Sequence, residues 1–224
     1  MSGITIARMT RRVVAVALLG AAVLGGTPCV AHAQGTWQST LQPRDLDGNT
    51  ANGPEAFYDT VLRITWLRDA DVKGLMDWGS ANAWASSLVV GSVGGWRLPT
   101  IVDTGRRGCD WSNDGSDCGY NPRTRDSSRT YSEMAHLWYV TLANKGYFDT
   151  AGTPVQPGWG LKVTGDFQKV RSYGYWSNVD YAKDRAYGWF FGFAAGGQDR
   201  IDKHNMAFAL PVHDGDVGAP IPRP

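Results

Sequence analysis

Hydrophobic and polar positions divide the chain into short apolar segments separated by long polar ones. The segment "FYDTVLRITWL", residues 57–67, is rich in β-branched and aromatic side chains, so it predicts a strand, or a hairpin if "YDT" turns the chain. The polar, turn-rich residues 34–55 before it predict an irregular lead-in. Near the end, three aromatic segments predict further strands: "YGYWSNVDY", "AYGWFFGFAA" and "MAFALPV". Gly196-Gly197 after the second of these predicts a hairpin turn.

Glycine alternates with bulky residues in "AYGWFFGFAA". Gly188 and Gly192 lie among aromatic side chains at strand spacing. This pattern predicts a strand with one bulky face and one face that another part of the chain can approach closely.

A first helix is predicted over residues 78–90. Asp77 is a suitable N-cap, Trp78 leads the segment, and the glycines from Gly91 onward end it. Three apolar residues repeat at helical spacing and would form the buried face: Ala81, Ala85 and Leu88.

A second helix is predicted from "SEMAHLWYVTLANKG". Ser132 would cap it, Glu133 would favour the positive end of the helix dipole, and Lys145-Gly146 would close it. One apolar stripe runs along it: Met134, Leu137, Trp138 and Leu142.

Two long stretches, residues 101–130 and 147–172, show no periodicity. Loops of this length are uncommon unless they are functional or disordered. The order of the predicted elements, with helices early and strands late, indicates an α+β domain.

The N-terminus changes the charge and the compartment. Arg8, Arg11 and Arg12 precede an apolar run, and "AHA" ends at Ala33, which is typical of a secretory signal peptide over residues 1–33. The apolar run is too short to span a membrane. Removing this segment takes three of the 22 basic residues and leaves 19 against 21 acidic ones. The signal peptide predicts a secreted or periplasmic bacterial protein. No window has the basic excess expected for nucleic-acid binding.

Two cysteines remain after the signal peptide, Cys109 and Cys118. In an oxidising compartment they predict a disulfide bond, which would contribute roughly 2.7 kcal/mol in the chain-entropy model. The spacing is not that of a C-x-x-C redox pair.

Several motifs occur in an order that resembles a known family. They are "DLDGNT", "YDTVLRITWL", "ANAWASSL", "GGWRLPT", "DCGYN", "SEMAHLWYVTL", "YWSNVDYA" and "DGDVG". Together they resemble the bacterial domain-of-unknown-function family that includes the C-terminal domain of the Legionella collagen-like adhesin. The resemblance implies a C-type-lectin-like fold, with two helices packed on antiparallel sheet and long loops. It implies a single domain over residues 34–217, followed by a flexible tail, 218–224.

The "RLPT" motif also resembles the sulfatase-modifying, formylglycine-generating domains. The chemistry of those domains needs cysteines in the C-terminal half, and this chain has none after Cys118. At this corner Gly94 and Gly95 permit unusual dihedrals and Pro99 fixes the backbone. We interpret Arg97 as a structural residue that meets a carboxylate or carbonyls, with ligand contact as the alternative.

Two acidic segments could bind calcium. "DWSNDGSD" places Asp110, Ser112, Asp114 and Ser116 at alternate positions with glycine in sixth place, which partly matches a calcium loop. Asn121 stands where a bidentate glutamate is expected. "DLDGN" also gathers oxygen ligands, from Asp45, Asp47 and Asn49. The alternative for both segments is an Asx-rich turn without an ion.

A ligand site is predicted around the first late strand and the loop of the two cysteines. Trp176, Asn178 and Asp180 alternate and would share one face of a strand, with Trp176 in the core. Many C-type lectins carry a Trp-Asn-Asp run on a comparable strand, whereas the spacing here is W-S-N-V-D. The candidate ligand-binding residues are Trp111, Asn113, Asn178, Asp180 and Tyr181.

Catalytic motifs such as H-E-x-x-H and G-x-S-x-G do not occur in the sequence. We interpret His136 as a partly buried histidine, Glu133 as a helix-start acid, and Asp199 and Asp202 as solvated. The sequence therefore favours a secreted, non-enzymatic module that binds a glycan or cell-surface component. The alternatives are a protein-interaction or structural module of the cell envelope and, third, a cryptic enzyme.

Overall fold

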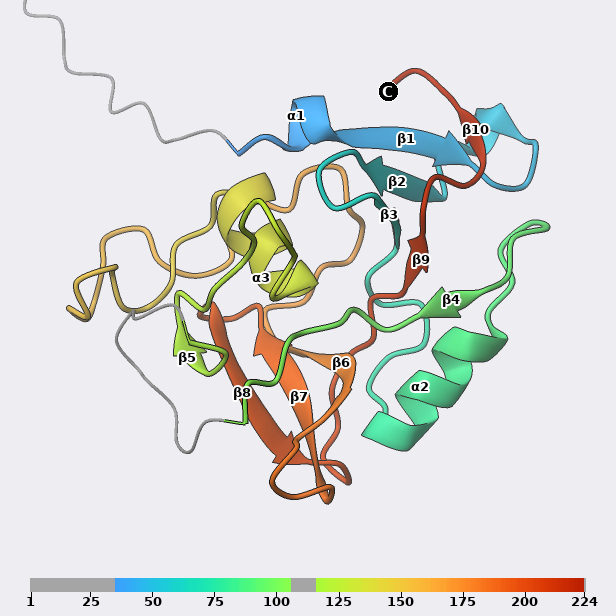
Figure 1. Ribbon diagram of the computed structural model, residues 1–224. Helices are drawn as coiled ribbons and strands as arrows, with labels where there is room; N and C mark the ends of the chain where they lie inside the picture. The colour runs from blue at the N-terminus through green and yellow to red at the C-terminus, as the bar shows by residue number, and fades with distance from the viewer. Residues whose placement is uncertain (1–34, 106–115, 224) are drawn as a thin grey trace, which may run out of the picture. The chain divides into compact units, whose positions relative to one another are not determined.

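A computed structural model describes residues 35–105 and 116–223 (Figure 1). The first part contains α1 (Trp37–Thr40), β1 (Leu41–Asp45), η1 (Thr50–Asn52), β2 (Ala56–Asp59), β3 (Ile64–Leu67), α2 (Trp78–Ser87) and β4 (Trp96–Arg97). The second part contains β5 (Gly119–Tyr120), α3 (Glu133–His136), η2 (Leu137–Thr141), β6 (Gly174–Asp180), β7 (Tyr187–Gly192), β8 (Gly197–Asp202), β9 (Val212–Asp214) and β10 (Ala219–Pro220).

The strands form two antiparallel sheets, and the fold class is α+β, as predicted. One sheet has six strands in the order β10-β1-β2-β3-β9-β4, and the other has four in the order β5-β8-β7-β6. Among the residues described, no helix is both long and apolar enough to cross a membrane.

The main core lies between the two sheets and α3. It joins Trp66 of β3, Trp138 of η2 and Phe191 of β7, all of which are fully buried. Figure 1 shows α3 between β1–β2 and the second sheet. Burying such large side chains is the main stabilising contribution, at roughly 25 cal/mol per Å² of apolar surface.

Helix α2 forms as predicted but ends three residues earlier. The side chain of Asp77 accepts a hydrogen bond from the Ser80 amide at 2.9 Å, and Ala81 and Ala85 are fully buried. The helix lies alongside β4 and the β6 edge of the second sheet. There the Trp78 indole occupies the space that a Cβ at Gly188 would take, 2.6 Å from the indole Cδ1 atom. The close approach predicted at this glycine is therefore confirmed.

The second predicted helix is correct at its start and too long at its end. Ser132 caps α3 by accepting from the Ala135 amide at 3.1 Å, and the predicted apolar stripe is buried. Helical structure stops at Thr141, because Ala143 adopts a φ of 53°. The Asn144 backbone amide donates to the Trp138 carbonyl at 3.0 Å, and its side chain bonds the backbone of Lys162 and Val163 at 2.8–2.9 Å, which ties the helix end to that segment.

Both ends of the domain depart from the prediction for the same reason. Residues 41–45, expected to be irregular, form β1, which pairs with β2 through Leu41–Asp59 and Arg44–Ala56. The predicted flexible tail contributes β10, which pairs with Arg44 and Asp45. These polar segments become strands because they pair with the edge of an existing sheet. This pairing outweighs their low local propensity for β-structure.

The segment "FYDTVLRITWL" forms the β2–β3 hairpin, with Asp59 accepting the amides of Val61 and Leu62 at the turn.

The predicted strands near the end of the chain are correct in part. The hairpin at Gly196-Gly197 joins β7 to β8, and "QDRID", not expected as a strand, supplies β8. "MAFALPV" is wrong as a strand: it makes isolated bridges at Ala207 and Phe208, and β9 begins only at Val212.

Candidate functional site

The "GGWRLPT" corner is held by an ion-pair network. Arg97 donates two hydrogen bonds to the Glu133 carboxylate, both at 2.9 Å, and two to Oδ1 of Asp214 at 2.6 and 3.0 Å. Glu133, which is 5% exposed, also accepts the Thr100 amide at 2.7 Å. Gly95 has a φ of 80°, and its position packs against His213. The Arg97 guanidinium thus has a structural role. Glu133 begins α3 and also binds Arg97 and the Thr100 amide.

The predicted ligand residues on β6 do not converge on one site. A bulge lies between Trp176 and Asp180, because the three residues of β6 between them lie opposite a single residue of β7, Trp189. Trp176 is buried, as predicted. The backbone amide of Asn178 donates to the Pro99 carbonyl, and its Oδ1 atom is buried and finds no hydrogen-bond partner among the described residues. Asp180 pairs with Lys203, whose ammonium lies 4.0 Å over the Trp78 ring.

Tyr181 instead lines a polar and aromatic pocket at the β6–β7 turn. The pocket has a volume of about 320 Å³ and is lined by Tyr181, Asp184, Tyr187, Asp199 and Arg200. The turn itself is tight, since the Tyr181 amide donates to the Tyr187 carbonyl at 2.9 Å and the Asp184 amide to the Tyr181 carbonyl at 3.1 Å. We call this the turn pocket.

One of the two tyrosine rings of the turn pocket is fixed by packing, and the other is exposed. Tyr181 packs edge-on against the buried Trp189 at 5.8 Å between centroids, and the Arg200 guanidinium lies 5.0 Å from the Tyr181 ring centroid. Tyr187 is 37% exposed at the other side of the turn. One ring is therefore braced from behind, and the other is available to a ligand.

Charges of both signs meet in the turn pocket. Arg200 donates to Asp199 at 3.2 Å, and Asp184 accepts the Ala186 amide at 3.0 Å. Burial raises the pKa of Asp199, while the Arg200 amide and charge act in the opposite direction. Asp199 was expected to be solvated, and this is wrong, because β8 places it beside the buried Cys118.

Sequence reasoning found Tyr181 and missed the other residues that line this pocket. The signal that could have found them is the polar turn bounded by a tyrosine at each end, Tyr181 and Tyr187. Arg200 and Asp199 reach the pocket only because β8 pairs with β7, with Trp189 opposite Arg200.

Most of the predicted calcium loop lies outside the described residues. These are Cys109, Asp110, Trp111, Ser112, Asn113 and Asp114. Ser116 donates its hydroxyl to the Cys118 carbonyl at 2.7 Å, and Cys118 is buried. The Cys109–Cys118 bridge and the calcium loop remain predictions.

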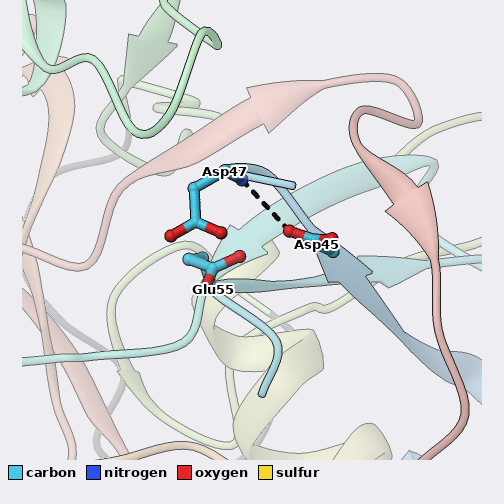
Figure 2. A group of neighbouring side chains, drawn as sticks. All are labelled: Asp45, Asp47 and Glu55. Carbon is cyan, nitrogen blue, oxygen red and sulfur yellow. Dashed lines mark hydrogen bonds between the residues drawn. The ribbon is translucent and has the colours of Figure 1, made fainter. Parts of the chain in front are cut away.

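The "DLDGN" segment forms an acidic turn, drawn in Figure 2 with Asp45, Asp47 and Glu55. One ligand oxygen from each of the three carboxylates lies within 4.8 Å of the others, so hard oxygen ligands for a cation are close together. Hydrogen bonds account for the same arrangement: Asp45 accepts the amides of Asp47 and Gly48, and Glu55 accepts that of Leu46. The segment thus has the geometry of an Asx turn, and a calcium ion on these carboxylates stays a prediction.

The three histidines of the described residues lie apart from the turn pocket's lining. His136 is buried in α3, and burial, with a smaller contribution from the Arg125 charge, lowers the pKa of His136 to about 4. His204 is exposed beside Asp202, and His213 packs on Trp96. None lines the turn pocket.

Comparisons of the chain with protein-family models, curated proteins and solved structures gave no match. The class that the fold and the pocket define is therefore an α+β domain with a small polar and aromatic pocket.

Proposed function

We propose that this chain is a secreted or periplasmic, non-enzymatic binding module of C-type-lectin-like architecture that recognises a glycan. The observation that carries the proposal is the turn pocket, where an exposed tyrosine, two carboxylates and a guanidinium surround one space. The architecture follows the motif resemblance and agrees with two antiparallel sheets and few helices.

The chemistry of the turn pocket suits a polyhydroxylated ligand. The carboxyl groups of Asp184 and Asp199 accept hydrogen bonds from hydroxyl groups, and Arg200 donates them. Tyr187 offers an apolar ring face with a polar end, which matches the mixed surface of a sugar. Because Asp199 and Arg200 already bond each other, they are positioned before a ligand arrives.

A glycan array followed by calorimetry on the strongest hit tests this proposal. We expect Tyr187→Ala and Asp184→Asn each to weaken binding about tenfold, roughly 1.4 kcal/mol per variant. Tyr173→Ala is the matched control, because Tyr173 is 49% exposed and lies outside the turn pocket. The array is run with and without a calcium chelator. Absence of binding in both conditions would refute glycan recognition.

A second hollow favours the alternative function, a protein-interaction or structural module of the envelope. It has a volume of about 330 Å³, with Phe190, Tyr173 and Met206 among its lining residues. Tyr173 and Met206 are each about half exposed. Exposed apolar side chains gathered at one place are typical of protein contact surfaces.

Met206→Asp separates the two functions. Under the alternative, a stoichiometric partner captured from the envelope fraction is lost in Met206→Asp and retained in Tyr187→Ala. The reverse pattern, with glycan binding lost only in Tyr187→Ala, supports the turn pocket instead. Partner capture and glycan binding are measured on the same two variants, and the two functions predict opposite patterns of loss.

A further inference from the structure

The second hollow lies on the face of the four-stranded sheet that points away from the main core. Gly174 of β6 and Gly192 of β7 line it and stand opposite each other in the two strands. Their chain neighbours Tyr175 and Phe191 are buried in the main core, so the glycines face the other way. The full lining is Ser172, Tyr173, Gly174, Phe190, Gly192, Ala194, Ile201, Asn205, Met206 and Ala207. We call it the Met206 hollow.

The two glycines are explained by space and not by backbone conformation. Neither has a positive φ, so the backbone at both positions would permit a side chain. A Cβ at Gly174 would lie 3.0 Å from Cδ2 of Phe190, so the missing side chain lets this ring lie against the sheet. A Cβ at Gly192 would meet only the Gly197 carbonyl oxygen at 3.3 Å and the Phe190 ring at 4.0 Å among the described residues. A strand glycine in such an open position is typical of a site that another group approaches closely.

The walls of the Met206 hollow combine a fixed ring with an adaptable side chain. Tyr173 is about half exposed, but its ring packs edge-on against Phe208 at 5.8 Å between centroids. Phe208 is itself held beside β6, because its amide donates to the Gly174 carbonyl at 2.9 Å. This pairing also brings Met206 to the hollow, where it is about half exposed. An unbranched thioether can adjust its shape to an aromatic ring and contacts such rings favourably.

The lining of the Met206 hollow, as the structure describes it, contains no charged side chain. The turn pocket, by contrast, contains two aspartates and Arg200. Removing a charged group from water without a partner is unfavourable, so the Met206 hollow favours a neutral and largely apolar occupant. One polar group is directed by a bond of its own: the Asn205 amide nitrogen donates to the Asp202 carbonyl at 3.1 Å, and its amide oxygen can accept from an occupant.

We propose that the Met206 hollow binds an aromatic side chain of a protein partner, and tryptophan in particular. The ring would lie over Gly192, with its edges against Phe190 and Tyr173 and with the Met206 thioether beside it. The indole N–H of a tryptophan would donate to the amide oxygen of Asn205. The volume, about 330 Å³, is sufficient for one such anchor, and an aromatic anchor in a pocket is the usual hot spot of a protein interface. The inference rests on the protein-interaction function given above as the alternative, and it names the group of the partner that this surface takes.

Methionine-methyl NMR on the full chain tests the proposal with four probes. They are N-acetyl-Gly-Trp-Gly-amide, the same peptide with leucine or lysine in the central position, and methyl glucoside. We expect the tryptophan peptide to shift the methyl signal of Met206 and to leave that of the fully buried Met134 unchanged. The leucine peptide should bind about tenfold more weakly, and the lysine peptide and the glucoside should not bind. Equal affinity for the tryptophan and leucine peptides, binding of the glucoside instead, or no shift at Met206 would overturn the proposal.

Variants then locate the site. Tyr173→Ala should weaken binding of the tryptophan peptide about tenfold, whereas Tyr187→Ala, at an exposed tyrosine outside the hollow, should leave the affinity unchanged. Gly192→Val places a side chain in the hollow and should abolish binding. If Gly192→Val fails to fold, Tyr173→Ala decides alone, and unchanged affinity in that variant would refute this site.

Failure of the aromatic anchor and failure of the protein-interaction function give different results. If Met206→Asp loses a stoichiometric partner while the tryptophan peptide does not bind, the surface contacts a protein and the aromatic anchor is rejected. If the peptide binds at Met206 and Tyr173→Ala weakens it, the anchor site is supported whether or not a partner is captured.

Discussion

Replacing Arg97 with methionine is expected to lower the free energy of unfolding by about 3–5 kcal/mol, the cost of removing one partner of a buried ion pair. The Glu133 carboxylate, with its side chain 7% exposed, would keep the Thr100 amide and lose both hydrogen bonds from the guanidinium. The same substitution frees Asp214, which is well exposed and contributes little. Urea denaturation, followed by tryptophan fluorescence, measures the difference.

Lys169→Met is the matched control for this prediction. Lys169 also pairs with an aspartate, Asp69, and the two side chains are 57% and 24% exposed. An exposed pair of this kind contributes about 1 kcal/mol or less. Equal losses for the two variants would mean that burial does not strengthen the Arg97–Glu133 pair and that the corner is held mainly by packing of Trp96 and Leu98.

Acidification is expected to destabilise the domain through His136 by roughly 3 kcal/mol. Burial lowers the pKa of His136 from 6.5 to about 4 in the folded chain, with a smaller effect of the Arg125 charge. The unfolded chain therefore binds a proton near pH 6.5 and the folded chain only near pH 4. Stability is fully present above pH 6.5 and falls as the pH drops towards 4, by about 1.4 kcal/mol per unit of pKa difference.

His136→Gln isolates this contribution, because glutamine does not titrate. Urea denaturation at pH 7.0, 5.5 and 4.5 should give a steep loss of stability for the natural chain and a shallower one for the variant. The carboxylates titrate in both proteins, so the difference between the two slopes belongs to His136. Parallel slopes would show that the histidine takes up its proton equally in both states.

Local signals in the sequence predicted the two helix starts and the hairpins. Asp77 and Ser132 cap helices because a side-chain oxygen can reach an amide two or three residues ahead, which depends only on neighbouring residues. Gly196-Gly197 turned as expected. The glycine at 188 was correctly interpreted as a site of close approach, although its partner, Trp78, could not be named.

The sequence did not predict which segments pair with each other in the sheets. β1 and β10 are polar segments that become strands through pairing: β1 joins the edge of the β2–β3 hairpin that follows it, and β10 joins β1 from the other end of the domain. The bulge in β6 broke the alternation on which Asn178 and Asp180 were grouped with Trp176. Arg200 and Asp199 joined Tyr181 in the turn pocket through the pairing of β7 with β8.

The sequence by itself determined the α+β class, the capped helix starts, the buried apolar stripe of the second helix and the role of the "GGWRLPT" corner as a turn in which Arg97 meets a carboxylate or carbonyls. Each of these follows from residues close in the chain or from the chemistry of one side chain. Only the tertiary structure decided that Arg97 meets the carboxylate of Glu133 and that the turn pocket combines Tyr187 with Arg200. These facts depend on which distant segments meet, and a ligand is recognised by groups that converge in space rather than along the chain.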